Sequence, residues 1–335
     1  MNRREFTSLA LLGLSSGVAS APALGRSQPA ESSLFGRQYA PVPRQSALNA
    51  SGSSTEFSTE FGEGQLSVLS DGHLQLPVSF LQPEGIEDTE LQDLLERYQL
   101  TGDAYTPACN ISVWQQGDRT VLFDVGAGSQ FMMSAGQLPE ALDAAGISPE
   151  SVTDIILTHA HPDHLWGLLD DFDDLLYSNA TIHIHRDELD YWQAEDTLSR
   201  TPESRQSFVV GAQSRLSRAE EQLSVFASGD EVLPGIEAVD TRGHTPGHTS
   251  LAIHQGSESV LIVGDALNNV ALSFEYPRLP SPADQDPEQA ALTRMALLDR
   301  LASEKMRMIG FHMPTPGFGR VERRDSAYRF VAESA

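Results

Sequence analysis

Three histidines and one aspartate lie within six residues of this 335-residue chain, at His159, His161, Asp163 and His164. Neutral imidazole binds zinc, iron, copper and nickel, and carboxylate oxygens also suit harder ions such as manganese. The apolar segment 155–157 predicts a buried strand, beyond which alternate residues of an extended chain share one side. The proline inside the cluster has a fixed φ and turns the chain. The cluster therefore predicts two adjacent metal ions rather than one.

Two later apolar segments, 261–263 and 309–311, also end next to a residue type that binds metals. Asp265 follows the first segment and His312 follows the second. A carboxylate at the tip of a buried strand costs free energy unless it is paired or bound to a metal. These residues and the histidine cluster predict a site that is assembled from several strand ends.

The pattern His-x-His-x-Asp-His after a strand resembles the metal-binding signature of the metallo-β-lactamase superfamily, with Trp166 where many members carry glycine. The resemblance implies two divalent cations, for which zinc is expected, and a shared ligand at Asp265. It also implies that Asp163 and Asp265 take part in catalysis. The implied ligands are His159, His161, His248 and Asp265 at one ion, and Asp163, His164, Asp265 and His312 at the other.

Three further positions are interpreted through the same resemblance. Segment 243–249 holds two histidines, and the family pattern places the ligand on His248, which leaves His244 as a turn residue or a residue behind the ligands. Asp124 matches a position that orients a ligand histidine, with a plain turn residue as the alternative. His183 and His185 form a second His-x-His, but no Asp-His follows, and we interpret both as residues on the face of a strand.

Residues 65–332 resemble the methyl parathion hydrolase-like branch of the superfamily, and the stretch around His312 is the part most typical of that branch. The resemblance implies a dinuclear hydrolase, often a homodimer, in which a bridging hydroxide attacks an ester-type bond of a small molecule: an aryl ester, an organophosphate triester or a lactone. Substrate-binding aromatic residues are expected at Phe131, Trp192 and Phe208, although each could be ordinary core.

Position 268 bears on the leaving group. Relatives that cleave homoserine lactones carry a tyrosine three residues after the shared aspartate, and this chain has Asn268 there, which we also expect to contact the substrate. An amide cannot protonate a departing alkoxide. The sequence therefore predicts a preference for aryl leaving groups, which need no acid.

The sequence pattern predicts strand pairs followed by helices, in two successive halves of the chain, and these elements must position the residues above. The clearest helix is expected at 287–304, where apolar residues recur at helical spacing. This order predicts an α/β fold, a four-layer αββα sandwich of the metallo-β-lactamase type with two packed mixed sheets and helices outside. We assign this hydrolase domain to residues 61–335.

The start of the chain has the composition of an export signal. Residues 1–25 combine Arg3 and Arg4, a short apolar run and a small-residue end, which resembles a twin-arginine signal peptide. Residues 26–60 are rich in Ser, Ala, Gln and Pro and predict a flexible leader or arm. A periplasmic or secreted protein is expected, with no membrane association once the signal is removed.

Composition excludes other classes of function. The chain has 47 acidic and 22 basic residues and a net charge of −25, so its surface repels nucleic acid and anionic membranes. Cys109 is the only cysteine, which rules out an intrachain disulfide and a cysteine cluster for metal binding.

Three alternatives remain open from the sequence. A metal-dependent oxidoreductase of the same superfamily, similar to persulfide dioxygenases, would use one iron, and the pair Asp163 and His312 argues for a second ion. A metal-binding protein without catalysis is the second alternative. Among hydrolases, a lactonase acting on acyl homoserine lactones or a β-lactamase could carry this fold; many β-lactamases use a cysteine ligand, and Cys109 is far from the ligand motifs in sequence.

Overall fold

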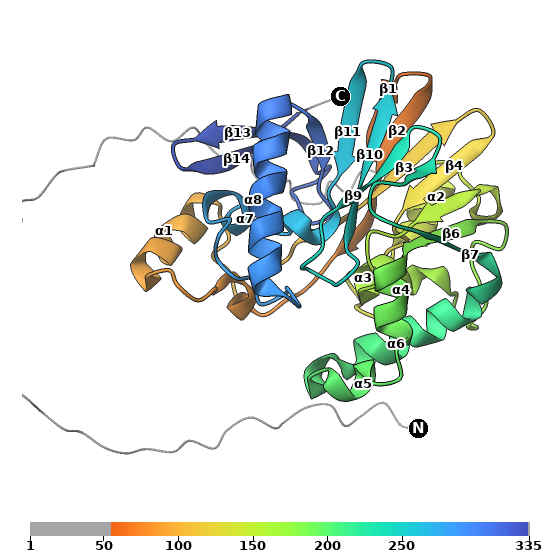
Figure 1. Ribbon diagram of the computed structural model, residues 1–335, viewed down its shortest axis with the longest axis horizontal. Coiled ribbons are helices and arrows are strands. Elements are labelled where there is room, and N and C mark those ends of the chain that lie inside the picture. Colours follow the sequence, from red (N-terminus) through yellow and green to blue (C-terminus); the bar gives the residue numbers. More distant parts are fainter. Residues whose placement is uncertain (1–54, 334–335) are drawn as a thin grey trace, which may run out of the picture. The chain divides into compact units, whose positions relative to one another are not determined.

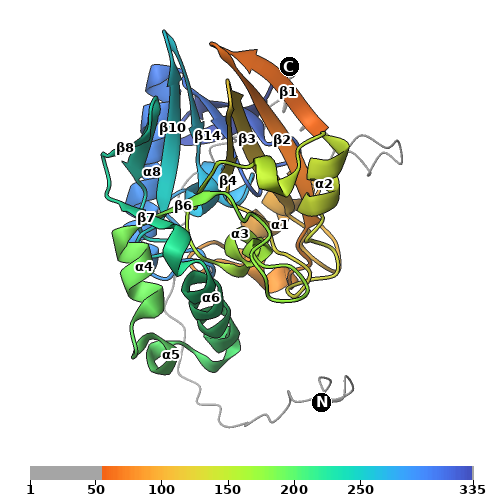
Figure 2. The same ribbon diagram turned by 90° about the vertical axis from the view of Figure 1, so that its right-hand side faces the viewer.

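The computed structural model describes residues 55–333 and contains two seven-stranded sheets (Figures 1 and 2). In the first sheet the strands follow the chain order, antiparallel from β1 to β4 and parallel from β4 to β7. Its strands are β1 (Thr55–Phe61), β2 (Gly64–His73), β3 (Ala108–Gln116), β4 (Arg119–Phe123), β5 (Asp154–Ile156), β6 (Thr181–His185) and β7 (Leu223–Phe226).

The second sheet has the order β14-β13-β12-β11-β10-β9-β8, and only its pair β11–β12 is parallel. Its strands are β8 (Glu231–Leu233), β9 (Ile236–Asp240), β10 (Thr249–Gln255), β11 (Glu258–Ile262), β12 (Arg307–Ile309), β13 (Phe318–Arg324) and β14 (Ala327–Ala332). Both sheets therefore mix parallel and antiparallel pairs, as predicted.

Helices cover the outer faces of the sheets. The α-helices are α1 (Asp88–Arg97), α2 (Leu138–Ala144), α3 (Pro162–Leu165), α4 (Arg186–Gln193), α5 (Thr197–Arg200), α6 (Gln206–Arg218), α7 (Leu272–Glu275) and α8 (Pro287–Glu304). Short 3₁₀ turns span 78–81, 149–151, 166–168, 203–205, 220–222 and 264–267. In Figure 1, α8 runs along the second sheet, and Figure 2 shows α4, α5 and α6 close together below the first.

The core has three apolar layers, which confirms the four-layer αββα sandwich. Strand β5 shows how one segment serves two of them: Ile156 packs between the sheets, whereas Ile155 points to the helices outside the first sheet. A strand buried on both faces is continuously apolar for this reason. The third layer packs Leu298 and Leu301 of α8 against the outer face of the second sheet.

Helix α8 matches its sequence prediction at both ends. The carboxylate of Asp286 accepts a hydrogen bond from the backbone N–H of Gln289, and Pro287 occupies the first turn. Both features are favoured at helix starts, because the first N–H groups lack partners within the helix. Among residues 55–333, no helix combines the length and apolar character needed to cross a bilayer.

The predicted boundary of the leader, residues 26–60, lies too far along the chain, because its last six residues belong to the folded domain. Strand β1 already begins at Thr55 and pairs with β2 over the whole span from Thr55 to Phe61. This strand has two apolar residues, Phe57 and Phe61, and they lie four positions apart, so the segment shows no alternating strand pattern beside the Ser-rich stretch. The expected signal peptide, residues 1–25, and residues 26–54 of the leader lie outside the described residues, and export stays a prediction.

Candidate metal centre

The histidine cluster lies where β5 ends and α3 begins. His159 and His161 belong to the connecting loop, and Pro162 occupies the first turn of α3, which carries Asp163 and His164. Proline suits this position because it has no N–H to leave unpaired. All four side chains of the motif are buried. The turn thus presents His159 and His161 from the loop and Asp163 and His164 from the helix, as predicted.

Three imidazoles converge at the first group of ligand atoms. His159 Nε2 lies 3.0 Å from His161 Nδ1, which in turn lies 3.0 Å from His244 Nε2. These three side chains can each offer a ring nitrogen within 4.8 Å of the others. Burial, and next the neighbouring imidazoles, holds the pKa of His159 and of His161 well below its usual range. Both rings are therefore neutral, which is the form that binds a cation.

The second group combines Asp163, His164, Asp265 and His312. His312 Nε2 lies 3.2 Å from Asp163 Oδ2 and 3.5 Å from Asp265 Oδ2, and His164 Nε2 lies 3.5 Å from Asp163 Oδ2. Burial alone would lower the pKa of His312, but the carboxylates of Asp265 and Asp163 raise it to about 10. Strand ends β5, β11 and β12 supply these residues, as the sequence predicts.

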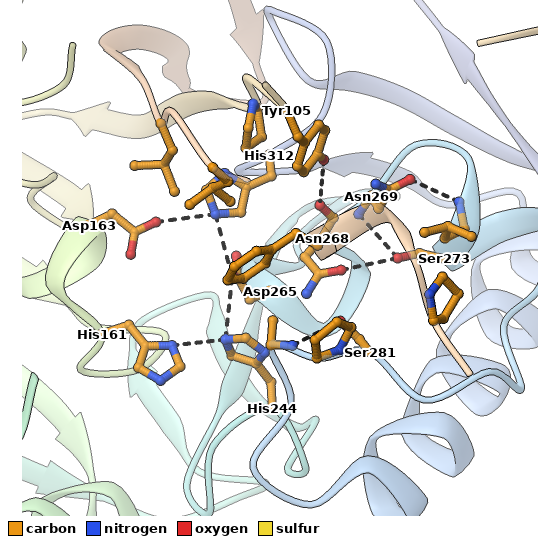
Figure 3. A pocket seen from close by; sticks show the side chains of 18 of the residues that line it. Tyr105, His161, Asp163, His244, Asp265, Asn268, Asn269, Ser273, Ser281 and His312 are labelled. Carbon is orange, nitrogen blue, oxygen red and sulfur yellow. Dashed lines mark hydrogen bonds and ion pairs between the residues drawn. The ribbon is translucent and has the colours of Figure 1, made fainter. Parts of the chain in front are cut away.

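Asp265 lies between the two groups (Figure 3). One carboxylate oxygen is 3.3 Å from His244 Nε2 and 3.5 Å from His312 Nε2, and the other is 3.4 Å from His164 Nε2. Burial by itself would raise the pKa of Asp265, but His312 and His164 hold it well below the usual range, so the group is ionised. Among residues 55–333, Asp265 is thus the one carboxylate that touches ligand candidates of both groups.

The structure contradicts the prediction that His248 is a metal ligand. Its Nε2 accepts a hydrogen bond of 2.9 Å from the backbone N–H of Asp265, and its Nδ1 lies 2.9 Å from Thr241 Oγ1. Both ring nitrogens are therefore used inside the protein. His248 directly precedes β10, whereas His244 stands earlier in the turn and reaches His161.

A buried carboxylate supports His244 from behind. His244 Nδ1 lies 3.1 Å from Asp284 Oδ1, and Arg294 Nη2 donates to Asp284 Oδ2 at 2.7 Å. A histidine that binds a metal through one nitrogen usually gives its other N–H to such a partner. The sequence analysis missed Asp284, because it lies 40 residues away from His244 and belongs to no motif.

Asp124 holds His164 in the same way. Its Oδ2 lies 2.8 Å from His164 Nδ1, while Oδ1 accepts the backbone N–H of Thr158 at 2.7 Å. Asp124 itself has a φ of 66°, a conformation that aspartate tolerates better than most residues. The structure thus places this side chain where the sequence prediction put it. His183 and His185, by contrast, bond to Asp154 and Ser228 and lie apart from the ligand groups.

A buried carboxylate that sequence reasoning missed connects the two ligand loops. Glu188 of α4 accepts hydrogen bonds from the backbone N–H of Ala160 and of Gly247, at 2.9 and 3.0 Å. It also accepts from Thr245 Oγ1 at 2.7 Å and from Trp192 Nε1 at 2.6 Å. Glu188 therefore fixes the distance between the loop that carries His159 and His161 and the turn that carries His244.

Glu188→Ala should lower the free energy of unfolding by about 4 kcal/mol, since about 1 kcal/mol is lost for each of the buried donors left without an acceptor. It should also weaken cation binding, because the two ligand loops lose their common anchor. Urea denaturation of the cation-loaded protein measures the first effect. Glu195→Ala, on an exposed glutamate just past the same helix, is the control. Equal stability of both variants would contradict the anchoring role.

The residues fit a pair of divalent cations. His164 Nε2 and Asp265 Oδ1 are fully buried and have no hydrogen-bond partner within residues 55–333. Unpaired buried polar atoms are costly, and cation ligation removes that cost. Cys109 adds a third atom type: its sulfur lies with ligand atoms of Asp163 and His312, all within 4.8 Å of one another. Its remoteness from the motifs in sequence therefore did not mean remoteness in space, although burial raises the pKa of its thiol well above the usual value.

A pocket of about 450 Å³ opens onto both groups. Its walls are largely apolar, and Phe131, Phe208 and Asn268 line it as predicted. Trp192 does not line it, since its bond to Glu188 holds it in the core, where it borders a neighbouring, more polar cavity. The pocket's apolar lining includes Leu74, Leu76, Phe80, Tyr105, Leu272 and Tyr276.

The sequence model of the metallo-β-lactamase superfamily matches residues 105–302, which is more than half of the chain and includes all the ligand candidates except His312. The chain belongs to this superfamily. A superfamily protein from Xenopus laevis, metallo-beta-lactamase domain-containing protein 1, is 29% identical over 210 residues, which cover 61% of this chain and 73% of the relative.

Two solved structures of the metallo-β-lactamase superfamily type resemble the fold closely, each with a TM-score of 0.78. The hydrolase AbOPH is 25% identical, and the match covers 84% of this chain and 98% of that chain. AidC, described as a dizinc quorum-quenching lactonase in complex with a hexanoyl homoserine product, is 28% identical with 84% and 99% coverage. These matches support a hydrolase of this superfamily; the methyl parathion hydrolase-like branch stays a prediction.

Proposed function

We propose that this protein is a hydrolase that holds two divalent cations, with zinc expected, and cleaves ester-type bonds of small, largely apolar substrates. The observation that carries the proposal is the position of Asp265, whose carboxylate reaches His244 of the first ligand group and both His164 and His312 of the second. Aryl esters, lactones and organophosphate triesters are the candidate substrates. The resemblance to a dizinc lactonase and to another hydrolase supports this class.

The residues would divide the work as follows. His159, His161 and His244 would hold one cation, Asp163, His164 and His312 the other, and Asp265 both. Bound cations would supply a water activated at neutral pH and would polarise the oxygen of the scissile bond. Asp124, Asp284 and Glu188 fix the ligand side chains beforehand, so that little reorganisation is needed when a substrate enters.

The pocket walls favour substrates with an apolar body. Phe131 and Phe208 meet edge to face with ring centroids 6.0 Å apart, and Phe208 also approaches the His161 ring at 6.0 Å. Burial of an acyl chain or an aryl group against these rings would place the ester beside the cations. An oxidoreductase with a single iron is less well supported, since Asp163, His164 and His312 complete a second set of ligands.

We expect about two divalent cations per chain. Elemental analysis of protein purified without chelator, before and after zinc supplementation, measures the stoichiometry. Turnover of p-nitrophenyl acetate, a phosphotriester and an acyl homoserine lactone should disappear after dialysis against a chelator and return with zinc or manganese. A stoichiometry that stays at one after supplementation would exclude the dinuclear site, and inactivity on the whole panel would exclude the proposed class.

A further inference from the structure

Asn268 cannot donate a proton to a leaving group, but the hydroxyl of Tyr105 lies next to it. Tyr105 lies on the loop before β3, and its backbone is fixed by two hydrogen bonds to Leu76, at 2.8 and 2.9 Å. Its side chain is largely buried and lines the same pocket as Asp265 and His312. The hydroxyl lies 3.4 Å from the backbone carbonyl of Asn268. Figure 3 shows the ring above Asn268, between His312 and Asn269.

The Tyr105 hydroxyl also makes a hydrogen bond with the side chain of Asn269, and its contact with the Asn268 carbonyl is weak. At 3.4 Å it is long for an O–H···O hydrogen bond, whose usual length is about 2.7–2.8 Å. The Asn268 amide itself points to Ser273, whose hydroxyl donates to its oxygen at 3.4 Å. Near residue 268, therefore, the phenol of Tyr105 and not the amide is the group that could give a proton to a ligand in the pocket.

We infer that Tyr105 protonates the leaving oxygen of the substrate, so that the enzyme accepts esters and lactones with alkoxide leaving groups. This inference rests on the proposed hydrolase function and extends its substrate class. It also replaces the preference for aryl leaving groups that Asn268 alone predicts. A second tyrosine in the pocket, Tyr276, has a different role, because its hydroxyl donates to Glu90 at 2.6 Å.

The step balances without a further reactant. A water oxygen forms a bond to the acyl carbon, and the bond from that carbon to the alkoxy oxygen then breaks, with its electron pair remaining on the oxygen. The phenol proton of Tyr105 passes to this oxygen and gives the free alcohol. The resulting phenolate recovers a proton released by the attacking water, so one water is consumed for each ester or lactone.

The test compares leaving groups in the cation-loaded enzyme. For Tyr105→Phe we expect kcat/KM on an acyl homoserine lactone and on an alkyl ester to fall by about 100-fold, the low end for loss of a general acid. Turnover of p-nitrophenyl acetate should change by less than about threefold, because nitrophenolate leaves without a proton. Tyr177→Phe is the matched control, because Tyr177 is a buried tyrosine that lines neither cavity near the ligand groups and its hydroxyl has no hydrogen-bond partner within residues 55–333. It should leave both rates near the wild-type values. Cation content and melting temperature should stay unchanged in both variants.

Two further measurements distinguish proton donation by Tyr105 from a purely structural role of this side chain. Tyr105→Phe combined with Asn268→Tyr should recover part of the lactone rate, because a phenol returns to the same region. In wild type, a series of aryl and alkyl acetates should show only a shallow fall of log kcat/KM as the pKa of the leaving group rises. Equal losses on lactone and nitrophenyl ester in Tyr105→Phe, or a wild type that cleaves only aryl esters, would overturn the role of Tyr105 alone. A wild type inactive on every ester would instead overturn the proposed function.

Discussion

Replacing Asp265 with alanine is expected to abolish hydrolysis. Because this one carboxylate touches His244, His312 and His164, its loss would leave two adjacent cations without their shared negative charge. Cation catalysis is worth several kcal/mol of transition-state stabilisation, so kcat/KM should fall by at least about 1,000-fold. The melting temperature of the zinc-treated protein should also fall, since fewer cations bind the native state.

Two measurements check this expectation. Elemental analysis should find fewer than two cations per chain in Asp265→Ala, and thermal melting with added zinc should show a smaller gain than in wild type. Asp240→Ala is the control, because Asp240 is an exposed aspartate that pairs with its neighbour Arg242 and lies outside both ligand groups. Normal turnover with normal cation content in Asp265→Ala would remove Asp265 from the centre.

The two histidines of the 243–249 segment should give opposite results when each is replaced by glutamine. His244→Gln should lower kcat/KM by more than about 100-fold, since loss of a partner behind a ligand already costs about 10–100-fold. His248→Gln should retain about two cations, because its Nε2 accepts from the Asp265 backbone and its Nδ1 meets Thr241. Its cost should appear in stability, at about 1–3 kcal/mol for a disturbed buried hydrogen bond.

Cation content and urea denaturation of the two variants, measured side by side, separate these effects. The pair is well matched, because both side chains are buried and both lie in one short turn. Loss of cations from His248→Gln together with their retention in His244→Gln would restore the family-based assignment and refute the one that the structure supports.

The fold and most of the ligand candidates were predictable because the signal is local. In each case a histidine or aspartate follows an apolar strand within a few residues, as Asp265 follows β11 and His312 follows β12. The end of β5 in the first sheet and the ends of β11 and β12 in the second meet at one site once the sheets pack together. The residue types that form the site could therefore be recognised from the local pattern of each segment. Strand β1 lacks such a signal, because only two of its seven residues are apolar and it continues a Ser-rich segment without a break.

The choice between His244 and His248 could not be made locally. Both lie in the same turn, four residues apart, and their roles depend on what faces them in the folded chain. Asp284 supports His244 from 40 residues away, and the Asp265 backbone occupies His248. Glu188 and Tyr105 were missed in the same way, because neither belongs to a motif and each acts through contacts that only the packing of distant segments creates.

The apolar layer between the sheets has a consequence for how preparations of this protein behave. That layer joins the sheets through residues such as Phe123, Ile156 and Ile262, and it contains none of the ligand candidates. The sandwich therefore has a source of cohesion that does not depend on the cations proposed for its rim. Protein prepared with too little metal should remain folded, while only a fraction of its molecules can hydrolyse substrate. Protein concentration alone would then overstate the number of working sites, and rates are best expressed per bound cation pair.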